Sequence, residues 1–469
     1  MAVITLQVAV RETAEPFVLT ILPMRLSPPI AFIAGALIVF AGQVSADTLR
    51  LKGSNTLGAR LAPALAEAFL RQRGCGQITR ERSAAQSIVI RGDGACAELT
   101  VDIDARGTAT GFIGLSDKTA ELAMASRPIN AAELALLPDL ANPGMEQVVA
   151  LDGLAIIVAS SSPLRELKLE EVRALFLGEV DSLAKFGGPS GPLKRYVRDD
   201  KSGTFDTFKH LVLRDRAIAG TNTLTYESSE QLAAAVARDP NGIGFVGLAA
   251  IGAARALKIS GTATEALAPN EFSVATEDYL LSRRIYLYHL PDAPKIALDF
   301  IAFSRSAAAS KIIDSEHFVA LNVRQFNPRL PADSPSEYLE LTNGLARLSL
   351  NFRFADGLSL LDSKSLSDLG RLAAYLQAQP AKTKVVLIGF SDSSESLPYM
   401  SLALSTDRVD YVAQRLAGAG VAINKARGLG AAAPLADNQT ALGREKNRRV
   451  EVWIEVGAAR STATSSSRP

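Results

Sequence analysis

The sequence predicts an α/β protein with two folded domains, a larger one built on a mainly parallel sheet and a smaller β-α-β-α-β unit. Short apolar runs with strand character alternate with amphipathic helical stretches, and that order favours a parallel sheet covered by helices. At 469 residues the chain exceeds one ordinary hydrophobic core. Between Phe326 and Asn343 the composition shifts to proline, asparagine, serine and acidic residues, which indicates a domain boundary.

The individual elements follow from these periodicities. In the larger domain we expect strands at 49–52, 151–158, 195–197, 243–246 and 284–288 and helices at 57–69, 169–177 and 204–213. In the smaller domain we expect strands at 348–354, 384–388 and 449–455 and helices at 363–379 and 405–417. The segment 457–469 is small, polar and serine-rich, and we expect it to be disordered.

The amino-terminal segment has the order of a secretory signal peptide. From Met24 onward, a basic residue precedes an apolar run at 30–40, and the small residues 44–46 follow it. This run is shorter than the roughly 20 apolar residues of a membrane-spanning helix. We expect cleavage after Ala46, with Met24 as an alternative start; a retained N-terminal anchor is the competing interpretation.

Charge and cysteine content narrow the possible partners. The chain has 50 Lys and Arg against 49 Asp and Glu, so its net charge does not favour binding to nucleic acid. Any anion must therefore be bound by a local group of donors and positive charges. Cys75 and Cys96 both lie in the predicted exported part and indicate one disulfide, which would stabilise the fold by about 3 kcal/mol; two free buried thiols are the alternative. The three histidines are scattered, so we predict no metal site and no cofactor.

Three polar turns at the starts of predicted helices are candidates for an anion site. The strongest runs from Arg198 to Thr204, where the arginine offers a forked cation and the serine, glycine and threonine offer hydroxyls and close backbone approach. A helix start also presents free backbone N–H groups and the positive end of the helix dipole. Segments 53–57 and 107–111 repeat this pattern. One such turn alone is usually an N-cap, whereas three in one domain favour a binding site.

These turns resemble the motifs of the periplasmic phosphate-binding proteins. Segment 198–204 is similar to their R-x-D-x-S-G-T signature, 53–56 to their G-S-x-T loop, 107–111 to their second Ser/Thr-rich loop and 240–246 to their P-x-x-I-G-Y/F-V turn. The resemblance covers most of 48–325 and implies a two-lobed type II periplasmic-binding-protein fold that closes over an unhydrated phosphate. The ligand residues that it implies are Thr56, the Leu57 backbone, Thr108 or Thr110, Ser126, Arg198, Ser202, Gly203 and Thr204.

One position departs from that family pattern. Segment 125–129 is similar to a shortened A-S-x-x-P/S-R-P motif, in which some members carry an aspartate after the serine that accepts a phosphate proton and rejects sulfate. Here Arg127 occupies that position, so selectivity among oxyanions is open. Asp199 or Asp200 is an alternative acceptor, and Arg127 is either part of the site or a plain ion pair.

The second domain resembles the OmpA-like peptidoglycan-binding family in three motifs that occur in the family's order. Segment 388–392 corresponds to G-H-T-D, 404–408 to L-S-x-x-R-A and 447–451 to N-R-R-V-E, and the resemblance covers about 346–456. A carboxylate and an arginine at the ends of elements suit a ligand that carries both an ammonium and a carboxylate.

This second resemblance implies specific roles for four residues. Asp392 and Arg408 would clasp the diaminopimelate moiety of the peptide stem, and Asn447 and Arg448 would shape the pocket wall; an ordinary capping or surface ion pair is the alternative for the first two. Phe390 replaces the usual histidine and Ser401 a common asparagine. By strand alternation we expect Arg448 and Arg449 to face opposite sides, with one of them solvated.

Together these patterns predict a signal peptide at 1–46, a phosphate-type solute-binding domain at 47–326, a linker at 327–345, an OmpA-like domain at 346–456 and a disordered tail at 457–469. The predicted protein binds phosphate or a similar oxyanion in the periplasm of a Gram-negative bacterium, associated with peptidoglycan or the outer membrane. An ABC importer's membrane subunits or a sensor would be its partner. The alternative is a structural or adhesive envelope protein. The sequence shows none of the common nucleophile-elbow, zinc-protease or Walker motifs, so we predict no enzymatic activity.

Overall fold

The computed structural model describes residues 48–455 except for the short gaps at 85, 95, 97–98, 200–201, 263, 355–359 and 394–397. The predicted signal peptide, its cleavage site at Ala46 and the tail 457–469 lie outside the described residues. The described residues from 48 to 455 belong to one compact unit. In the described part, no helix combines the length and apolar character needed to cross a membrane.

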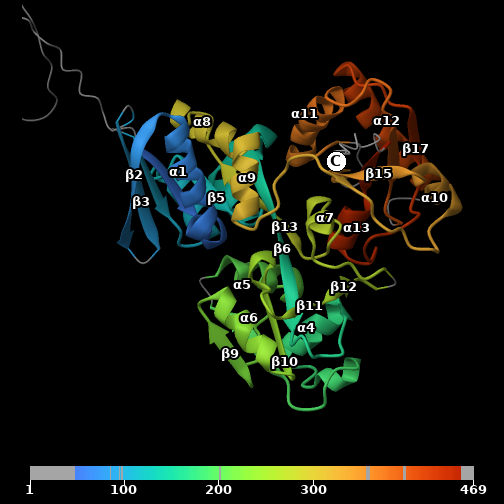
Figure 1. The fold of residues 1–469 in the computed structure, drawn as a ribbon, viewed down its shortest axis with the longest axis horizontal. Coiled ribbons are helices and arrows are strands. Elements are labelled where there is room, and N and C mark those ends of the chain that lie inside the picture. The colour runs from blue at the N-terminus through green and yellow to red at the C-terminus, as the bar shows by residue number, and fades with distance from the viewer. Residues whose placement is uncertain are drawn as a thin grey trace, which may run out of the picture. The chain divides into compact units, whose positions relative to one another are not determined.

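The first lobe of the N-terminal module is an open mixed sheet (Figure 1). Its strands, in sheet order, are β2 (Cys75–Ala84), β3 (Ser87–Gly94), β4 (Thr100–Asp104), β1 (Thr48–Gly53), β5 (Leu122–Ala125), β13 (Ser282–Tyr288) and β6 (Glu146–Val158). The prediction of a mainly parallel sheet is wrong, because the β2–β3–β4 meander and the returning strand β13 pair antiparallel with their neighbours. β1 is parallel to both β4 and β5, so the carboxyl ends of these three strands share one edge. That edge is where ligands bind in open α/β sheets.

Helices cover this sheet with apolar faces. The helices of the first lobe are α1 (Ala62–Gln72), α2 (Thr108–Ser116), α3 (Ala131–Leu136), α8 (Lys295–Ser304) and α9 (Ala307–Ser315). Leu65 and Phe69 of α1 share a buried cluster with Phe300 of α8 and Ile313 of α9. The Cys75–Cys96 disulfide, predicted from the sequence, joins the start of β2 to the segment after β3.

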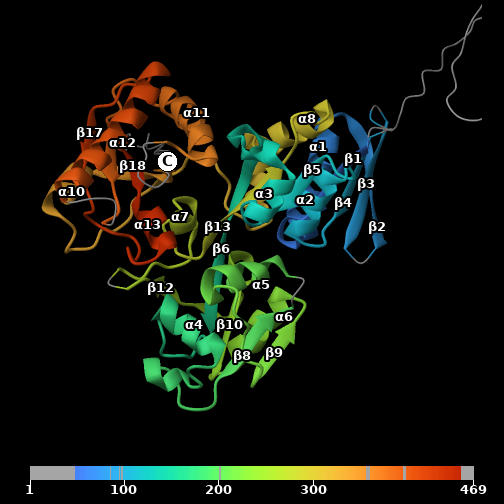
Figure 2. The same ribbon diagram turned by 180° about the vertical axis from the view of Figure 1, so that it is seen from behind.

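The second lobe shares strand β6 with the first. Residues 146–153 of β6 pair with β13, and residues 154–158 pair with β10 (Gly242–Gly247). The sheet continues through β8 (Lys194–Arg198) to β9 (Thr223–Tyr226), and Figure 2 shows these strands side by side. β6 therefore connects the two lobes as one continuous strand.

Shorter elements complete the second lobe. They are β7 (Glu166–Lys168), α4 (Leu169–Leu177), α5 (Gly203–Phe208), α6 (Ser229–Arg238), β11 (Arg255–Ala256), β12 (Lys258–Ser260) and α7 (Glu271–Ala275). α4 has the predicted bounds and ends at Gly178, whose φ of 76° is the left-handed conformation that favours glycine. The helix predicted at 204–213 is instead α5 followed by a π-helical turn, Lys209–Leu213.

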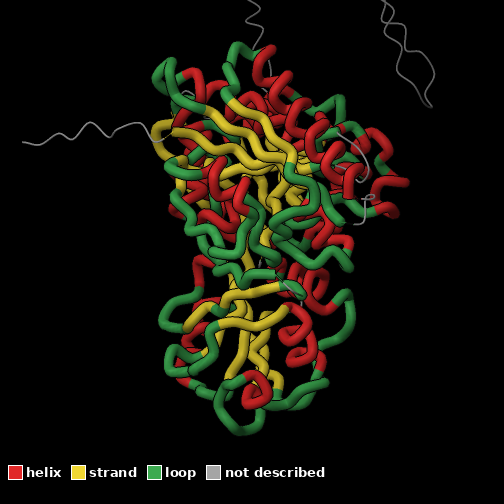
Figure 3. The backbone as a smooth tube through the Cα atoms, turned by 90° about the vertical axis from the view of Figure 1, so that its right-hand side faces the viewer, coloured by secondary structure: helices red, strands yellow, loops and turns green. Residues whose placement is uncertain are grey.

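The C-terminal module has a five-stranded sheet in the order β14 (Gln325–Phe326), β15 (Leu345–Arg353), β18 (Arg449–Glu455), β16 (Val385–Phe390) and β17 (Lys425–Gly428). Its helices are α10 (Ser336–Thr342), α11 (Ser363–Gln377), α12 (Pro398–Gly418) and α13 (Ala441–Asn447). Figure 3 shows helices flanking the strands of each sheet. α11 and α12 cover one face, and α10 packs Tyr338 against Phe390 and Trp453 on the other.

The segment 327–345, expected to be a linker, differs from that expectation. It contains α10, whose Tyr338 and Leu341 are buried in the C-terminal core. β14, which falls within the range expected for the first domain, pairs with β15 of the C-terminal sheet. Polar composition predicted a boundary here, but tertiary packing makes this segment part of the second module.

Candidate functional site

A cleft of about 810 Å³ lies between the two lobes of the N-terminal module. Thr56 lines it from the turn after β1, Asp152 from the connecting strand β6, and Arg198 and Ser202–Thr204 from the turn between β8 and α5. Five of the predicted ligand residues, namely Thr56, Arg198, Ser202, Gly203 and Thr204, are therefore brought together. Segments that are far apart in the chain converge because β1 and β8 lie in different lobes and run in opposite directions, so the turns that follow them face each other.

The start of α5 is a tight, buried turn. The Ser202 hydroxyl accepts the Thr204 backbone N–H at 3.2 Å and so caps the helix. Ser202, Gly203 and Thr204 are all buried. A side chain at Gly203 would collide with the Thr56 hydroxyl of the opposite lobe, so only glycine allows this approach.

Arg198 lies half-buried at the other end of the turn. Its Nε donates to the Tyr226 carbonyl at 3.2 Å, its Nη1 donates to the Ser229 hydroxyl, and its Nη2 lies 3.6 Å from Asp199. Burial lowers the pKa of Arg198, and Asp199 and Glu230 oppose that shift. The guanidinium is thus fixed at the cleft by neighbours that only partly compensate its burial.

Arg283 is a cleft residue that sequence reasoning missed. It lies on β13, and its Nε and Nη2 donate to Asp152 at 2.9 and 2.6 Å. Nη1 donates to the Gly203 carbonyl at 2.5 Å and to the Thr207 hydroxyl, and Nη2 donates to the Thr56 hydroxyl at 3.3 Å. One guanidinium therefore touches both lobes and the connecting strand. The signal available in the sequence was an arginine, Arg283, directly before the predicted strand 284–288.

The remaining predicted ligand residues lie beside the cleft rather than in its described lining. Leu57 begins a π-helical turn and its side chain is buried in the core. The Thr108 and Ser126 hydroxyls lie 3.4 Å apart, and Thr108 Oγ1 accepts the Ser126 backbone N–H. Thr110 donates to the Gly107 carbonyl at 2.8 Å. Thr108 and Ser126 follow β4 and β5, the neighbours of β1, so they share the sheet edge of Thr56.

Arg127 forms an ion pair inside the first lobe. Its guanidinium makes two bonds with the Glu133 carboxylate, at 2.7 and 2.8 Å, and lies 5.9 Å from the centre of the Phe112 ring. Glu133 in turn closes the capping box of α3. Of the two alternative acceptors, Asp199 lines the cleft, whereas Asp200 lies outside the described residues.

The second candidate site lies at the end of β16. Asp392 is fully buried, and Arg448 Nη1 donates to its Oδ2 at 2.9 Å. Arg448 Nε donates to the Phe354 carbonyl at 3.3 Å, and the Arg408 guanidinium lies 5.4 Å from the centre of the Phe354 ring. Arg448 thus contacts both Asp392 and Phe354, and Arg408 lies over the ring of Phe354.

Asn447 organises the adjoining loop. Its side-chain oxygen accepts the backbone N–H groups of Leu435 and Ala436, and its amide donates to the Ala436 carbonyl and to Asn438. Asn438 accepts the backbone N–H of Ser393, the residue after Asp392. Asn447 therefore shapes the wall of this site through the backbone, without presenting its own amide to solvent.

The expectation that either Arg448 or Arg449 is solvated is wrong, because both side chains are buried. Arg449 Nε donates to Glu451 at 2.8 Å, and its guanidinium lies 3.8 Å from the centre of the Phe390 ring. α10 covers this face of the sheet, which alternation within one strand does not reveal. Burial opposes ionisation of Glu451, but Arg347 and Arg449 outweigh it and lower its pKa to about 2.

Comparison with known proteins finds two separate matched segments. Residues 82–308 match the PBP superfamily domain, and residues 353–448 match the OmpA family. The chain joins a PBP-superfamily domain to an OmpA-family domain.

The PBP domain has relatives among named phosphate-binding proteins. It is 28% identical over 210 residues to protein SphX of Synechococcus elongatus, covering 42% of this chain and 62% of that protein. It is 21% identical to the phosphate-binding protein PstS of Borreliella burgdorferi, covering 47% of this chain and 80% of that protein. A crystal structure of an ABC-type phosphate transport receptor from Vibrio cholerae has a TM-score of 0.47 at 22% identity, covering 58% of this chain and 99% of that chain.

The OmpA domain is 37% identical over 116 residues to outer membrane porin F of Pseudomonas fluorescens, covering 24% of this chain and 35% of that protein. It is 36% identical over 114 residues to the probable lipoprotein YiaD of Escherichia coli, covering 24% of this chain and 51% of that protein. The OmpA match therefore spans about half of YiaD and about a third of porin F, and the SphX match spans less than two thirds of that protein.

Proposed function

We propose that the PBP domain binds phosphate or a similar oxyanion in the interlobe cleft and that the OmpA domain holds the protein on peptidoglycan. The observation that carries the first half is the convergence of Thr56, Arg198 and Ser202–Thr204 on one cleft. The names of the PstS relatives support phosphate as the anion.

The chemistry of the cleft suits a tetrahedral anion that has lost its water. Arg198 supplies a permanent charge with several donors, and Thr56 and Thr204 supply hydroxyls from opposite lobes. The charge of Arg283 is matched by Asp152, so Arg198 carries most of the attraction. Asp199 is a candidate acceptor for a proton on the anion, a contact that sulfate at neutral pH cannot make.

Isothermal titration calorimetry of the mature chain with phosphate, arsenate and sulfate tests this site. We expect Arg198→Gln to weaken phosphate binding by about 10- to 100-fold, since hydrogen bonds to charged groups contribute about 1.5–3 kcal/mol. Arg216→Gln is the matched control, because Arg216 forms an exposed pair with Glu179 in the same lobe. Absence of binding for every anion would contradict the proposal.

The wall site is tested by retention on purified sacculi. Asp392→Asn and Arg408→Gln should reduce retention, because each removes a charge expected to hold the zwitterionic end of the peptide stem. Arg427→Gln, which breaks an exposed pair with Glu337, should leave it unchanged. Circular dichroism of each variant separates loss of the site from loss of the fold, and full retention by both folded site variants would overturn the assignment.

We further propose that the protein works in the periplasm of a Gram-negative bacterium as a receptor, not an enzyme, and presents its anion to an ABC importer or a sensor. Its relatives include phosphate-binding proteins and outer-membrane proteins, which supports the cell envelope as its place. The alternative is a structural or adhesive envelope protein. Sacculus retention without binding of any oxyanion would favour that alternative.

A further inference from the structure

We propose that the OmpA domain braces the hinge of the PBP domain and so sets how far the anion cleft opens. The contacts that suggest this lie on β13 and on the turn that leads into it. On the OmpA side they include Lys446, which directly precedes the candidate wall residues Asn447 and Arg448 in the chain. The brace does not depend on which anion binds, whereas its expected effect on affinity rests on the proposed function.

Adjacent residues of strand β13 point in two directions. One residue faces the cleft, and the residues before and after it contact the OmpA domain. Arg283 points to the cleft and contacts Thr56 and Gly203. Ser282 and Arg284, one position to either side, bond to the OmpA domain, as strand alternation requires. Lys446 Nζ donates to Ser282 Oγ at 3.1 Å, and Arg284 Nη2 donates to Asp362 Oδ2 at 2.8 Å.

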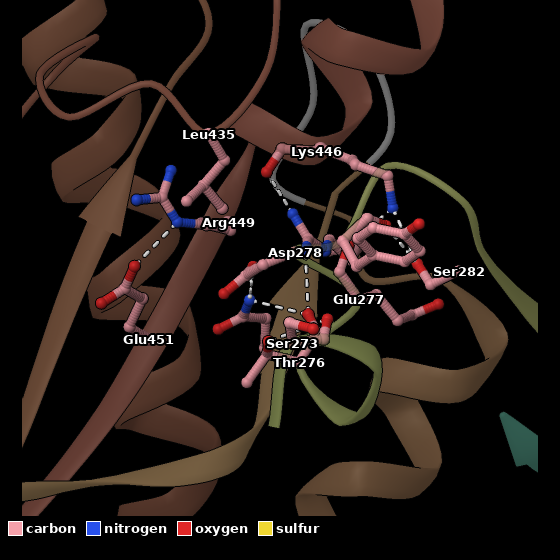
Figure 4. A network of polar contacts seen from close by, with 12 residues as sticks. Ser273, Thr276, Glu277, Asp278, Ser282, Leu435, Lys446, Arg449 and Glu451 are labelled. Atoms are coloured by element: carbon pink, nitrogen blue, oxygen red, sulfur yellow. Dashed lines mark hydrogen bonds and ion pairs between the residues drawn. The ribbon is translucent and has the colours of Figure 1, made fainter. Parts of the chain in front are cut away.

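The turn that leads into β13 is held by the first long strand of the OmpA domain. Asn351 donates to the Thr276 carbonyl at 2.9 Å and to Asp278 at 2.7 Å. Arg353 donates to the same two acceptors at 2.9 and 3.2 Å. Lys446 Nζ also donates to the Glu277 carbonyl at 2.6 Å, and Figure 4 shows the Lys446 side chain pointing towards Ser282.

These bonds define one docked geometry. Asp278 and Arg353 are almost fully buried, and each charge has a directed partner from the other domain. Buried ion pairs add little net stability, because removing the charges from water offsets their attraction. Their directed hydrogen bonds instead fix orientation. The OmpA domain is therefore docked at a set angle and not tethered loosely.

The OmpA domain also touches each lobe separately. In the first lobe, Ser363 donates to Glu146 at the start of β6. On the side of the second lobe, a Cβ at Gly261 would lie 3.0 Å from the backbone nitrogen of Asp437. A body in contact with both lobes and with the hinge resists a change in the angle between them.

Opening the cleft would bend β6 and β13 and move Ser282 and Arg284 relative to Lys446 and Asp362. The docked OmpA domain thus favours the closed arrangement of the structure, in which Thr56 lies against Gly203. A cleft held near its closed form needs less reorganisation when the anion enters, which raises the apparent affinity.

The brace can be tested without any ligand by distances between spin labels on the full chain. Ile113→Cys in the first lobe and Leu224→Cys in the second place labels at exposed positions, and the two native cysteines are bonded to each other. We expect one narrow distance distribution in the parent chain and a broader, longer one in Lys446→Met. A milder variant, Asp362→Asn with Ser363→Ala, keeps an N-cap residue for α11. It provides a second test of the brace in case the Lys446→Met protein does not fold.

Arg427→Gln is the control, because its exposed pair lies within the OmpA domain. Identical narrow distributions in the parent and in a folded brace variant would overturn the proposal, and so would a broad distribution in the parent.

Phosphate titration of the same proteins tests the consequence for binding. The brace variants contact no cleft residue that we assign to the anion, yet we expect them to bind phosphate at least about fivefold more weakly. If the parent chain binds no phosphate, the proposal that phosphate is the ligand is wrong. The distance measurements then still test whether the OmpA domain restrains the two lobes. Broadened distances with unchanged affinity would refute the effect on binding.

Discussion

The two arginines of the cleft, Arg283 and Arg198, differ in the partners that surround their guanidinium groups. Arg283 makes two close bonds with Asp152 and organises the backbone of α5. Arg198 donates to the Tyr226 carbonyl and the Ser229 hydroxyl and lies 3.6 Å from Asp199. This contrast supports our proposal that Arg198 attracts the anion, and we propose that Arg283 positions the cleft.

Replacement of Arg283 by lysine separates charge from geometry. Arg283→Lys keeps the cation but loses the fork that joins Asp152, Gly203 and Thr56, so we expect phosphate affinity to fall by about tenfold. Calorimetry measures the affinity, with Arg216→Lys as the exposed control. Unchanged binding by a folded Arg283→Lys protein would remove Arg283 from the site.

Gly203 provides a steric test of closure. In Gly203→Ala the new methyl group would collide with the Thr56 hydroxyl, so the lobes should close less far and phosphate affinity should fall. Gly220→Ala in the same lobe is the control, because a Cβ there meets no atom within 4 Å. The two variants are compared by calorimetry, and equal affinities would show that Thr56 and Gly203 do not meet in the bound state.

Single elements were predicted with uneven success, for identifiable reasons. α4 and β18 have the predicted bounds, because each combines clear periodicity with a defined end. β17 and α13 were missed, since their short polar sequences carry little periodic signal. α12 begins seven residues earlier than the predicted start at 405, at Pro398, a residue that favours the first turn of a helix.

The β2–β3 hairpin depends on its disulfide. Much of β2 is exposed, so the Cys75–Cys96 bond supplies stability that burial does not. We expect Cys75→Ser with Cys96→Ser to lower the free energy of unfolding by about 3 kcal/mol, measured by chemical denaturation. Reduction of the parent protein should give a similar loss. An unchanged unfolding curve would mean that the hairpin melts independently of the core.

At the scale of the whole molecule, the stability of the folded protein should be sensitive to acid. Burial opposes ionisation of Glu277, but the nearby Arg284 and Lys364 outweigh it and lower the pKa of this carboxyl. In the same way, Arg347 and Arg449 lower the pKa of Glu451 to about 2. Because these pKa values lie below the unfolded value of 4.5, their contribution is present above pH 4.5 and is lost as the pH falls towards 2.

Denaturant unfolding at a series of pH values measures this dependence. We expect stability to decrease between pH 4.5 and 2 in the parent chain and the decrease to be shallower in Glu451→Gln, which cannot take up that proton. A folded Glu451→Gln protein with the same acid slope as the parent would exclude Glu451 as a contributor.

The sequence by itself determined the two domains, the disulfide, eight of the eighteen strands in the described residues, and the turns that supply Arg198, Ser202–Thr204, Asp392 and Arg408. These features are local, because hydrophobic periodicity, helix caps and short motifs each depend on residues that are close together in the sequence. Tertiary structure alone decided that Arg283 crosses the cleft, that Arg449 is buried beneath α10, and that Lys446 and Asn351 dock the OmpA domain on the turn before β13. Those pairs are far apart in the chain, and only packing of the folded elements brings their charges together.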